Sequence, residues 1–264
     1  MVNRVAVLWV LLASVCLAEY AAFTKPGSGE RSGWLSLLGS DERRIDAHIF
    51  RAGEAELCVL DEGDATPRYG SLEAAMKQAG CTAGVNGGYF GAGVSRTPIG
   101  LVRHAGRTIS PLATKGFTVA GVVYDTGSAI NLVRTGRLRT PVESMREAIQ
   151  GGPFLVDQGQ VVPGLERQKK AARTFIATDG AGRWCLAVTS PLTLHELACW
   201  LAEPGSMGDF RIINALNWAG GSSCAFWDKA AGVHLPGFKA VRNYVGVRPR
   251  SSSGGGSSKK TPAR

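Results

Sequence analysis

The sequence predicts an α+β fold, a single domain in which a hairpin-rich mixed sheet is flanked by a few helices. Two observations support this class. Strand-like segments are joined by short turns rich in Gly and Asp, and the helix signals are few and lie apart from one another. The 264 residues contain no repeat period, and no linker divides the central part of the chain. We therefore expect one domain.

Apolar and β-branched residues mark the expected strands. These strands cover residues 56–60, 117–124, 129–133, 154–156, 161–162, 173–178, 184–189, 212–218 and 241–247. The turn Asp125-Thr126-Gly127-Ser128 joins two of them, and Asp179-Gly180-Ala181-Gly182 joins two more. Strands that follow each other across such short turns pair as antiparallel hairpins.

Capping signals predict three helices, over residues 71–79, 140–150 and 193–204. The first has Ser71 as its N-cap and Gly80 as its stop. The second begins with Thr140-Pro141-Val142-Glu143, which places Pro at the first helical position and Glu at the third. The third begins with a capping box of Thr193 and Glu196.

Both ends of the chain are expected to lie outside the domain. Residues 1–18 have the positive start, apolar run and cleavage context of a secretory signal peptide. The run is shorter than the roughly 20 residues that span a bilayer, so we expect a secreted or periplasmic protein with no stable membrane span after cleavage. Residues 19–53 form an N-terminal extension, 54–247 the domain, and 248–264 a disordered basic tail.

Most of the net charge of +9 belongs to these ends. Five of the charges lie from Arg248 onward and one is Arg4, which leaves about three for the folded part. A basic balance of this kind gives little support to nucleic-acid binding, and no nucleic-acid partner is predicted.

Five cysteines remain after removal of the signal peptide, in a compartment that permits disulfides. They are Cys58, Cys81, Cys185, Cys199 and Cys224. At most two bridges can form, and the sequence leaves their pairing open. Cysteine and histidine residues are too widely spaced for a zinc-thiolate site. No cofactor is predicted, and the need for a divalent metal stays open.

Three Gly-Gly motifs stand where predicted secondary structure ends. They are Asn86-Gly87-Gly88-Tyr89-Phe90, Gly151-Gly152-Pro153 and Asn217-Trp218-Ala219-Gly220-Gly221-Ser222-Ser223. Glycine allows backbone amides to approach a ligand closely. Any turn can use Gly-Gly, so each motif alone is a weak signal.

The order of these motifs, with Arg173-Thr174 and the helical segment Thr193–Ala198 between the last two, resembles the phosphodiester glycosidase family. This is the domain of N-acetylglucosamine-1-phosphodiester alpha-N-acetylglucosaminidases. The resemblance covers residues 54–247. It implies cleavage of a sugar-1-phosphodiester or a related glycosidic bond of an exopolysaccharide, with a carbohydrate or sugar-phosphate as the partner.

The resemblance also implies a set of site residues. Arg173, Asn86 and Asn217 are the candidate catalytic residues, and Arg173 has the planar guanidinium that binds phosphate in two places. The candidate substrate-binding residues are Gly87, Gly88, Gly151, Gly152, Gly220, Gly221, Ser222 and Ser223. Structural alternatives are an ion pair for Arg173 and turn closure for the two asparagines.

The chain departs from the family pattern where a carboxylate is expected. Ala219 stands in place of the usual Asp, and the strand that usually ends near Asp-Gly ends here at residues 188–191. Loss of a general acid or base costs on the order of 10²- to 10⁴-fold. The alternative function is therefore a catalytically degenerate member that binds envelope or extracellular glycan. The possible substitutes are Asp157, Asp179, Glu196 and Asp228, with His195 and His234 as possible proton shuttles.

Other motifs offer weaker interpretations. Asp125-Thr126-Gly127-Ser128 resembles the active-site loop of aspartic proteases, although it is also an ordinary hairpin turn. Ser222 and Ser223 lack the second glycine of a hydrolase nucleophile elbow. The aromatic residues Trp218, Phe226 and Trp227 are suited either to stack on sugars or to fill the core.

Overall fold

The structure is a computed structural model, and it describes residues 21–24, 33–39, 43–64 and 66–250. The predicted signal peptide, parts of the predicted N-terminal extension and residues 251–264 of the predicted tail lie outside the described residues. No helix among the described residues is long and apolar enough to cross a membrane.

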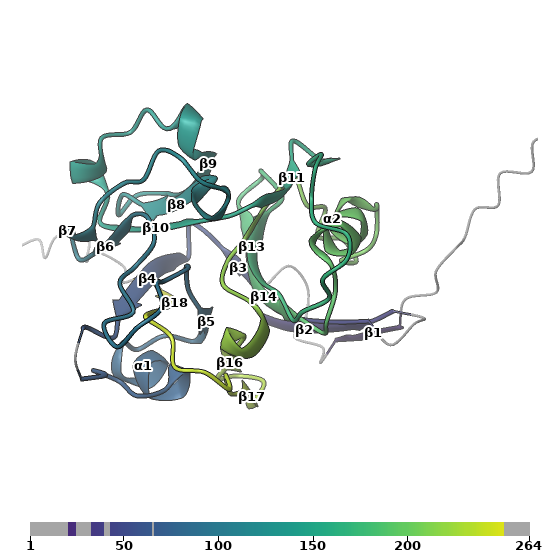
Figure 1. The fold of residues 1–264 in the computed structure, drawn as a ribbon. Coiled ribbons are helices and arrows are strands. Elements are labelled where there is room, and N and C mark those ends of the chain that lie inside the picture. The colour runs from purple at the N-terminus through teal and green to yellow at the C-terminus, as the bar shows by residue number, and fades with distance from the viewer. Residues whose placement is uncertain (1–20, 25–32, 40–42, 65, 251–264) are drawn as a thin grey trace, which may run out of the picture.

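Three antiparallel sheets make up the fold (Figure 1). The large sheet contains β1 (Ala21–Thr24), β2 (Gly33–Leu38), β3 (Arg44–Arg51), β14 (Arg183–Thr189), β13 (Thr174–Thr178), β15 (Asn214–Asn217), β11 (Phe154–Asp157) and β12 (Gln160–Val161), in that spatial order. The β10 sheet contains β7 (Arg107–Ser110), β6 (Val102–His104), β10 (Glu147–Gly151), β8 (Gly121–Asp125) and β9 (Ile130–Arg134). The β18 sheet contains β17 (Val233–Leu235), β16 (Phe226–Asp228), β5 (Ala83–Asn86), β18 (Asn243–Pro249) and β4 (Ala55–Asp61).

Among the described residues, two α-helices flank these sheets, α1 (Leu72–Gln78) and α2 (Leu194–Ala202). Single turns of 3₁₀ helix connect some of the strands. They are η1 (Phe117–Val119), η2 (Thr135–Arg137), η3 (Val142–Ser144) and η4 (Gly221–Ser223). The predicted α+β class with few helices is confirmed. The strands form three sheets where one mixed sheet was expected, because the β10 and β18 sheets each present an apolar face to the large sheet.

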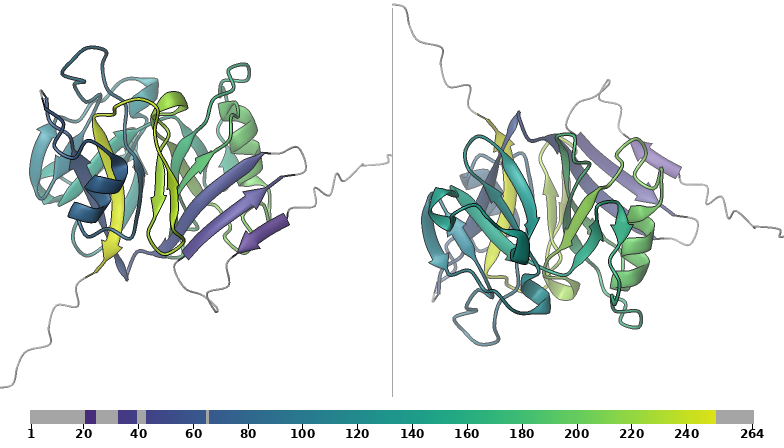
Figure 2. Two further views of the ribbon diagram at one scale, coloured as in Figure 1. Left: turned by 90° about the horizontal axis from the view of Figure 1, so that it is seen from below. Right: turned by 90° about the horizontal axis from the view of Figure 1, so that it is seen from above.

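Other elements lie on both faces of the large sheet at its central strands, with α2 on one face and the β10 and β18 sheets on the other (Figures 1 and 2). Side chains alternate along β13, so that Phe175 and Ala177 pack with α2 in one core cluster. Ile176, between them, lies in a second cluster with Val85 of the β18 sheet and Val123 of the β10 sheet. The large sheet is therefore the central layer on which the other elements pack.

Local capping signals correctly predict both α-helices. Ser71 accepts a hydrogen bond from the Ala74 amide at 3.1 Å, and Gly80 follows the helix with φ of 67°. Thr193 and Glu196 form a reciprocal capping box at the start of α2. The predicted hairpins β11–β12 and β13–β14 are also present.

The predicted helix over residues 140–150 is wrong. Its first part is the single turn η3, and its second part is the strand β10, which pairs with β8 and β6. The Thr140 hydroxyl bonds the Tyr124 hydroxyl at 2.8 Å and caps nothing. Pairing on both sides of β10 therefore outweighs a capping signal that is local to the sequence.

The predicted strand over residues 117–124 begins later, at Gly121. Residues Phe117–Val119 form η1, and the Val119 carbonyl accepts from the side chains of Thr135 and Gln150, at 2.5 and 3.2 Å. A carbonyl in a strand accepts from the backbone amide of a neighbouring strand. Here the two side chains donate to the Val119 carbonyl, so residue 119 needs no strand partner.

Strands from the predicted N-terminal extension and from the start of the predicted tail belong to the sheets. Strand β3 pairs with β14 through seven residues, from Ile45–Thr189 to Arg51–Arg183. At the other end, Arg248 and Pro249 pair with β4 as part of β18. Described residues on both sides of 54–247 are thus built into the fold.

Candidate functional site

The three Gly-Gly motifs meet at one place, where the three sheets come together. Asn86 ends β5 of the β18 sheet, Gly151 ends β10, and Asn217 ends β15 of the large sheet. The Ala219 amide donates to the Gly87 carbonyl at 3.2 Å, and the Gly152 amide donates to the Asn217 carbonyl at 2.8 Å. The fold thus brings together three motifs that begin at residues 86, 151 and 217.

Most glycines of these motifs serve close packing. A Cβ at Gly151 would lie 2.2 Å from the Trp218 ring, and a Cβ at Gly220 would lie 2.6 Å from the Ala172 carbonyl oxygen. The amides of Gly87, Gly88, Gly152 and Gly221 donate to Asn243 O, Asn243 Oδ1, Asn217 O and Ala172 O, respectively. These four amides are therefore occupied within the protein.

Asn86 is fully buried and ties two motifs together. Its Nδ2 donates to the Ala219 carbonyl at 2.6 Å. Its Oδ1 accepts from the Thr174 hydroxyl at 2.7 Å and from the Ala225 amide at 3.0 Å. Since both lone pairs of Oδ1 are used, Asn86 is suited to hold the site in shape.

Asn217 has an acceptor that no protein group satisfies. Its Nδ2 donates to the Tyr89 hydroxyl at 2.8 Å and lies within 3.2 Å of the Gly152 and Trp218 carbonyls. The residue is 1% exposed, and its buried Oδ1 has no hydrogen-bond partner. Buried polar atoms are nearly always paired, so this oxygen is suited to accept from a bound ligand.

Arg173 supplies a cation beside Asn217 and Tyr89. Its Nε donates to the Leu192 carbonyl at 2.9 Å and its Nη2 to the Lys169 carbonyl at 2.7 Å. Burial lowers the pKa of Arg173, while the nearby Tyr89 and Glu166 raise it. An arginine stays protonated in proteins, so two carbonyls fix the direction of a permanent positive charge.

Tyr89, Thr174 and Cys224 complete this cluster, and the sequence interpretation did not select them. Burial raises the pKa of Tyr89 to about 12, which keeps its hydroxyl protonated at neutral pH. Cys224 lies 3.2 Å from the Thr174 hydroxyl, and burial raises its pKa to about 11. Tyr89 and Thr174 stand within the motifs Asn86–Phe90 and Arg173-Thr174, and this is the signal that could have selected them as site residues.

The carboxylates considered as substitutes for the missing Asp are held elsewhere. Asp157 pairs with Arg134, Asp179 with Arg183, Glu196 with Thr193 and Lys170, and Asp228 with His48. Ala219 itself is 5% exposed.

The carboxylate that does lie against Arg173 is Glu166. Its Oε2 lies 3.9 Å from Arg173 Nη2 and has no hydrogen-bond partner. The Lys169 amide lowers the pKa of Glu166, opposed by partial burial, so the group is ionised at neutral pH.

The remaining predicted groups lie outside this cluster. His195 lies 3.5 Å from the Cys199 sulfur on α2. Trp218, Phe226 and Trp227 are buried core residues. Within the described part of the chain, no three or more His, Cys, Asp or Glu side chains form a group that could hold a metal ion.

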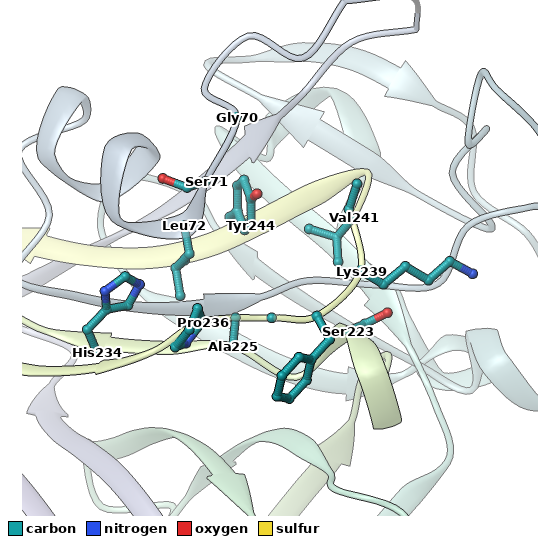
Figure 3. Close-up of a pocket in the computed structure, with 13 residues that line it drawn as sticks. Gly70, Ser71, Leu72, Ser223, Ala225, His234, Pro236, Lys239, Val241 and Tyr244 are labelled. Carbon is teal, nitrogen blue, oxygen red and sulfur yellow. The ribbon is translucent and has the colours of Figure 1, made fainter.

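A pocket borders the last motif on the side of α1 (Figure 3). Ser223 and Tyr244 lie on its wall, together with His234, Phe238 and Lys239. The amides of Phe238 and Lys239 donate to the Ser222 carbonyl at 2.9 and 3.0 Å. The Ser222 carbonyl thus anchors the loop that lines this pocket, and Ser223 lies on the pocket wall.

Asp125, the residue of the protease-like motif, is fully buried in a structural role. Its Oδ1 accepts from the Gly127 amide at 2.6 Å and its Oδ2 from the Leu57 amide at 3.1 Å. Arg146 lies 3.7 Å away. The hairpin interpretation holds, and the carboxylate additionally joins the β10 sheet to the edge of the β18 sheet.

Comparison with known proteins places these motifs in a family context. The sequence pattern of the phosphodiester glycosidase family matches residues 79–248. No curated protein sequence matches the chain. Three solved structures share its fold. The first is the zebrafish N-acetylglucosamine-1-phosphodiester alpha-N-acetylglucosaminidase catalytic domain, auto-inhibited by its pro-peptide, with a TM-score of 0.58, 14% identity and 88% of each chain covered.

The other two structures are bacterial. A hypothetical protein from Synechocystis has a TM-score of 0.54 and 16% identity, covering 87% of this chain and 67% of that one. A putative exported protein from Burkholderia pseudomallei has a TM-score of 0.53 and 13% identity, covering 82% and 74%. At these identities the likeness is one of fold.

Proposed function

The chain belongs to the phosphodiester glycosidase family, and on this premise we propose that it hydrolyses a sugar-1-phosphodiester or a related glycoside outside the cytoplasm. The single observation that carries this proposal is the position of Arg173. Its fixed positive charge lies beside Tyr89, whose hydroxyl is bonded to Asn217, a residue with an unsatisfied buried acceptor. A cation and hydrogen-bonding groups of this kind are what a sugar phosphate requires.

The proposed reaction breaks the bond between the anomeric carbon and the phosphate oxygen. Water adds to the carbon, and the phosphomonoester leaves with the bonding electrons. Arg173 stabilises the negative charge that grows on the phosphate. The Tyr89 oxygen accepts from Asn217 Nδ2 at 2.8 Å, so its own proton is free to donate to a phosphate oxygen.

Loss of the family Asp at position 219 weakens this chemistry less than it would for an ordinary glycoside. A phosphomonoester departs as a stabilised anion, so it needs less proton donation than a sugar alcohol. The loss falls mainly on the activation of water. Glu166 Oε2 lies 3.9 Å from Arg173 Nη2, and we assign Glu166 the role of holding the guanidinium in place.

A second candidate function is glycan binding without hydrolysis, and Ala219 is the observation that favours it. Its methyl group neither transfers a proton nor attacks carbon. Each of the four carboxylates considered as substitutes has a structural partner elsewhere. In this case the same cluster would retain a sugar phosphate and release it unchanged.

The test is turnover of an N-acetylglucosamine-1-phosphodiester substrate panel by wild type, Arg173→Ala, Ala219→Asp and the control Arg167→Ala. Arg167 is an exposed arginine of the same segment. Hydrolysis by wild type that falls roughly 10²-fold or more in Arg173→Ala, with Arg167→Ala unchanged, supports the enzyme. Activity that first appears in Ala219→Asp supports the binding protein. No turnover and no sugar binding in any variant would remove both functions.

A further inference from the structure

Cys58 and Cys81 are buried together beneath helix α1. Cys58 lies on β4, and Cys81 follows the stop residue of α1. Each is 3% exposed, and both belong to the core cluster that packs α1 on the β18 sheet. The two residues are separated in sequence by α1, so only the fold brings them together.

The register of the β18 sheet places the two sulfurs side by side. Cys58 pairs directly with Gly246 on β18. A Cβ built at Gly246 would lie 2.8 Å from the Cys81 sulfur, so this sulfur occupies the space that a side chain at 246 would fill. Side chains directly opposite in a sheet are neighbours, so the Cys81 sulfur, which takes the place of a side chain at position 246, lies next to the Cys58 side chain. A hydrogen bond from the Cys58 thiol, together with burial, raises the pKa of Cys81 well above its usual range.

We propose that Cys58 and Cys81 form a disulfide bond in this protein. Two thiols lose their protons and two electrons as the sulfur–sulfur bond forms. A small-molecule or protein disulfide accepts the electrons and is reduced to two thiols. Cys185, Cys199 and Cys224, the other cysteines of the described residues, stay free.

One cation, Arg248, lies beside the buried pair. The Arg248 side chain spans from Glu56 Oε2, at 3.2 Å, to the Ala79 carbonyl, at 3.4 Å. Its positive charge acts on both sulfurs and favours their thiolates, and for Cys81 this effect is smaller than the opposing effects of the Cys58 thiol and of burial. Both thiols are free in the structure, so bond formation requires only their oxidation.

The remaining cysteines are placed differently. Cys185 is buried in the core between the large sheet and α2, Cys199 is exposed on α2, and Cys224 lies beside Thr174. A Cys58–Cys81 bond would tie β4 to the connection between α1 and β5. Strand β5 ends at Asn86, so the bond would stabilise the strand that carries the first glycine motif.

The experiment maps the thiols of the full chain after equilibration in a buffer of reduced and oxidised glutathione. The protein is unfolded in guanidinium chloride, alkylated without reduction, digested and analysed by mass spectrometry. We expect one crosslinked peptide pair that contains Cys58 and Cys81, with Cys185, Cys199 and Cys224 alkylated. Alkylation of both Cys58 and Cys81, or a crosslink to any other cysteine, would overturn the proposal.

Thermal unfolding gives an independent measurement. Dithiothreitol should lower the melting temperature of the wild type by roughly 5 to 10 °C, because the bond constrains the unfolded chain. The variant Cys58→Ala/Cys81→Ala should not respond to dithiothreitol, whereas the buried-cysteine control Cys185→Ala should respond like the wild type. An equal response of all three proteins would contradict the proposal. If the double variant does not fold, the peptide map of the wild type decides alone.

Discussion

Two buried polar clusters of this protein differ in whether their side-chain oxygens have hydrogen-bond donors. Between the β10 and β18 sheets, the Asp125 carboxylate accepts from the Gly127 and Leu57 amides, and Glu147 accepts from the Val59 and Ala105 amides. At the meeting point of the glycine motifs, Asn217 keeps a buried oxygen without a partner. We call the first, formed by Asp125 and Glu147, the closed cluster, because its carboxylate oxygens accept from backbone amides. We call the second, around Asn217, the open cluster, because the Asn217 oxygen has no donor.

This difference separates groups that hold the fold from groups that are available to a ligand. A buried carboxylate whose acceptors are satisfied by backbone amides stabilises the arrangement of strands that it joins. An unsatisfied buried oxygen costs free energy until something donates to it. The comparison predicts that variants in the closed cluster change stability, and that variants in the open cluster change binding and turnover.

The largest expected effect is the loss of Asp125. Asp125→Ala removes the acceptor of two amides and leaves Arg146 without this buried counter-charge. We expect the free energy of unfolding to fall by about 3 to 5 kcal/mol in urea or guanidinium titrations. A change below about 1 kcal/mol would mean that the closed cluster does not hold the sheets together. By contrast, an ordinary surface hairpin turn would tolerate this change.

Tyr89→Phe should produce the next largest effect, on activity alone. Removal of the phenol proton donor should lower kcat/KM on a sugar phosphodiester by roughly 10²-fold, and more for poorer leaving groups. The matched control is Tyr124→Phe, which removes a hydroxyl bonded to Thr140 at 2.8 Å in the β10 sheet. The control should lose about 1 kcal/mol of stability and keep its kcat/KM. Equal activity of the two variants would contradict the division between the clusters.

The His48–Asp228 pair, which joins β3 to β16, predicts an acid dependence of stability. His48 Nδ1 lies 2.7 Å from Asp228 Oδ2, and both groups are buried. Burial alone would raise the pKa of Asp228, but the interaction with His48 holds it below the ordinary 3.8. A lowered folded-state pKa stabilises the protein above the unfolded-state value and loses that effect as the pH falls through the folded-state value.

Wild type and Asp228→Asn should therefore differ most in stability near neutral pH. Their melting temperatures should converge below about pH 4, where the carboxylate becomes protonated. Melting curves recorded from pH 2 to 7 measure this convergence. A difference that grows toward acid pH would show that Asp228 does not act through its negative charge.

The smallest expected effect comes from a helix cap whose side chain belongs to neither cluster. Ser71→Ala removes the acceptor of the Ala74 amide, and we expect a loss of about 1 kcal/mol in the free energy of unfolding. Turnover should stay unchanged. A loss of activity would indicate that α1 and the adjacent pocket take part in substrate binding, since Ser71 also lines that pocket.

Sequence patterns predicted those elements whose causes are local. The capping box of Thr193 and Glu196 and the cap at Ser71 identify helices because each hydrogen bond spans only three residues. The helix predicted from Thr140 failed for the opposite reason. The partners of β10 lie on β6 and β8, and the sequence does not reveal which strands pair.

The candidate site was predictable to the same degree. The order of the motifs selected Arg173, Asn86 and Asn217, but it did not separate the satisfied Asn86 from the open Asn217. Tyr89 and Glu166 are assigned to the candidate site by contacts seen in the structure. Tyr89 contacts Asn217, and Glu166 contacts Arg173. Such contacts depend on the approach of several loops, which no spacing along the chain encodes.

The sequence by itself determined the family, the α+β class, both helices and the glycines that allow three loops to meet. Only the tertiary structure decided which polar groups are satisfied, which carboxylates are held elsewhere, and that Cys58 and Cys81 are neighbours. The physical reason is that capping and turn preferences act over a few residues. Burial and hydrogen-bond completion, in contrast, are set by strands that pair across the whole chain.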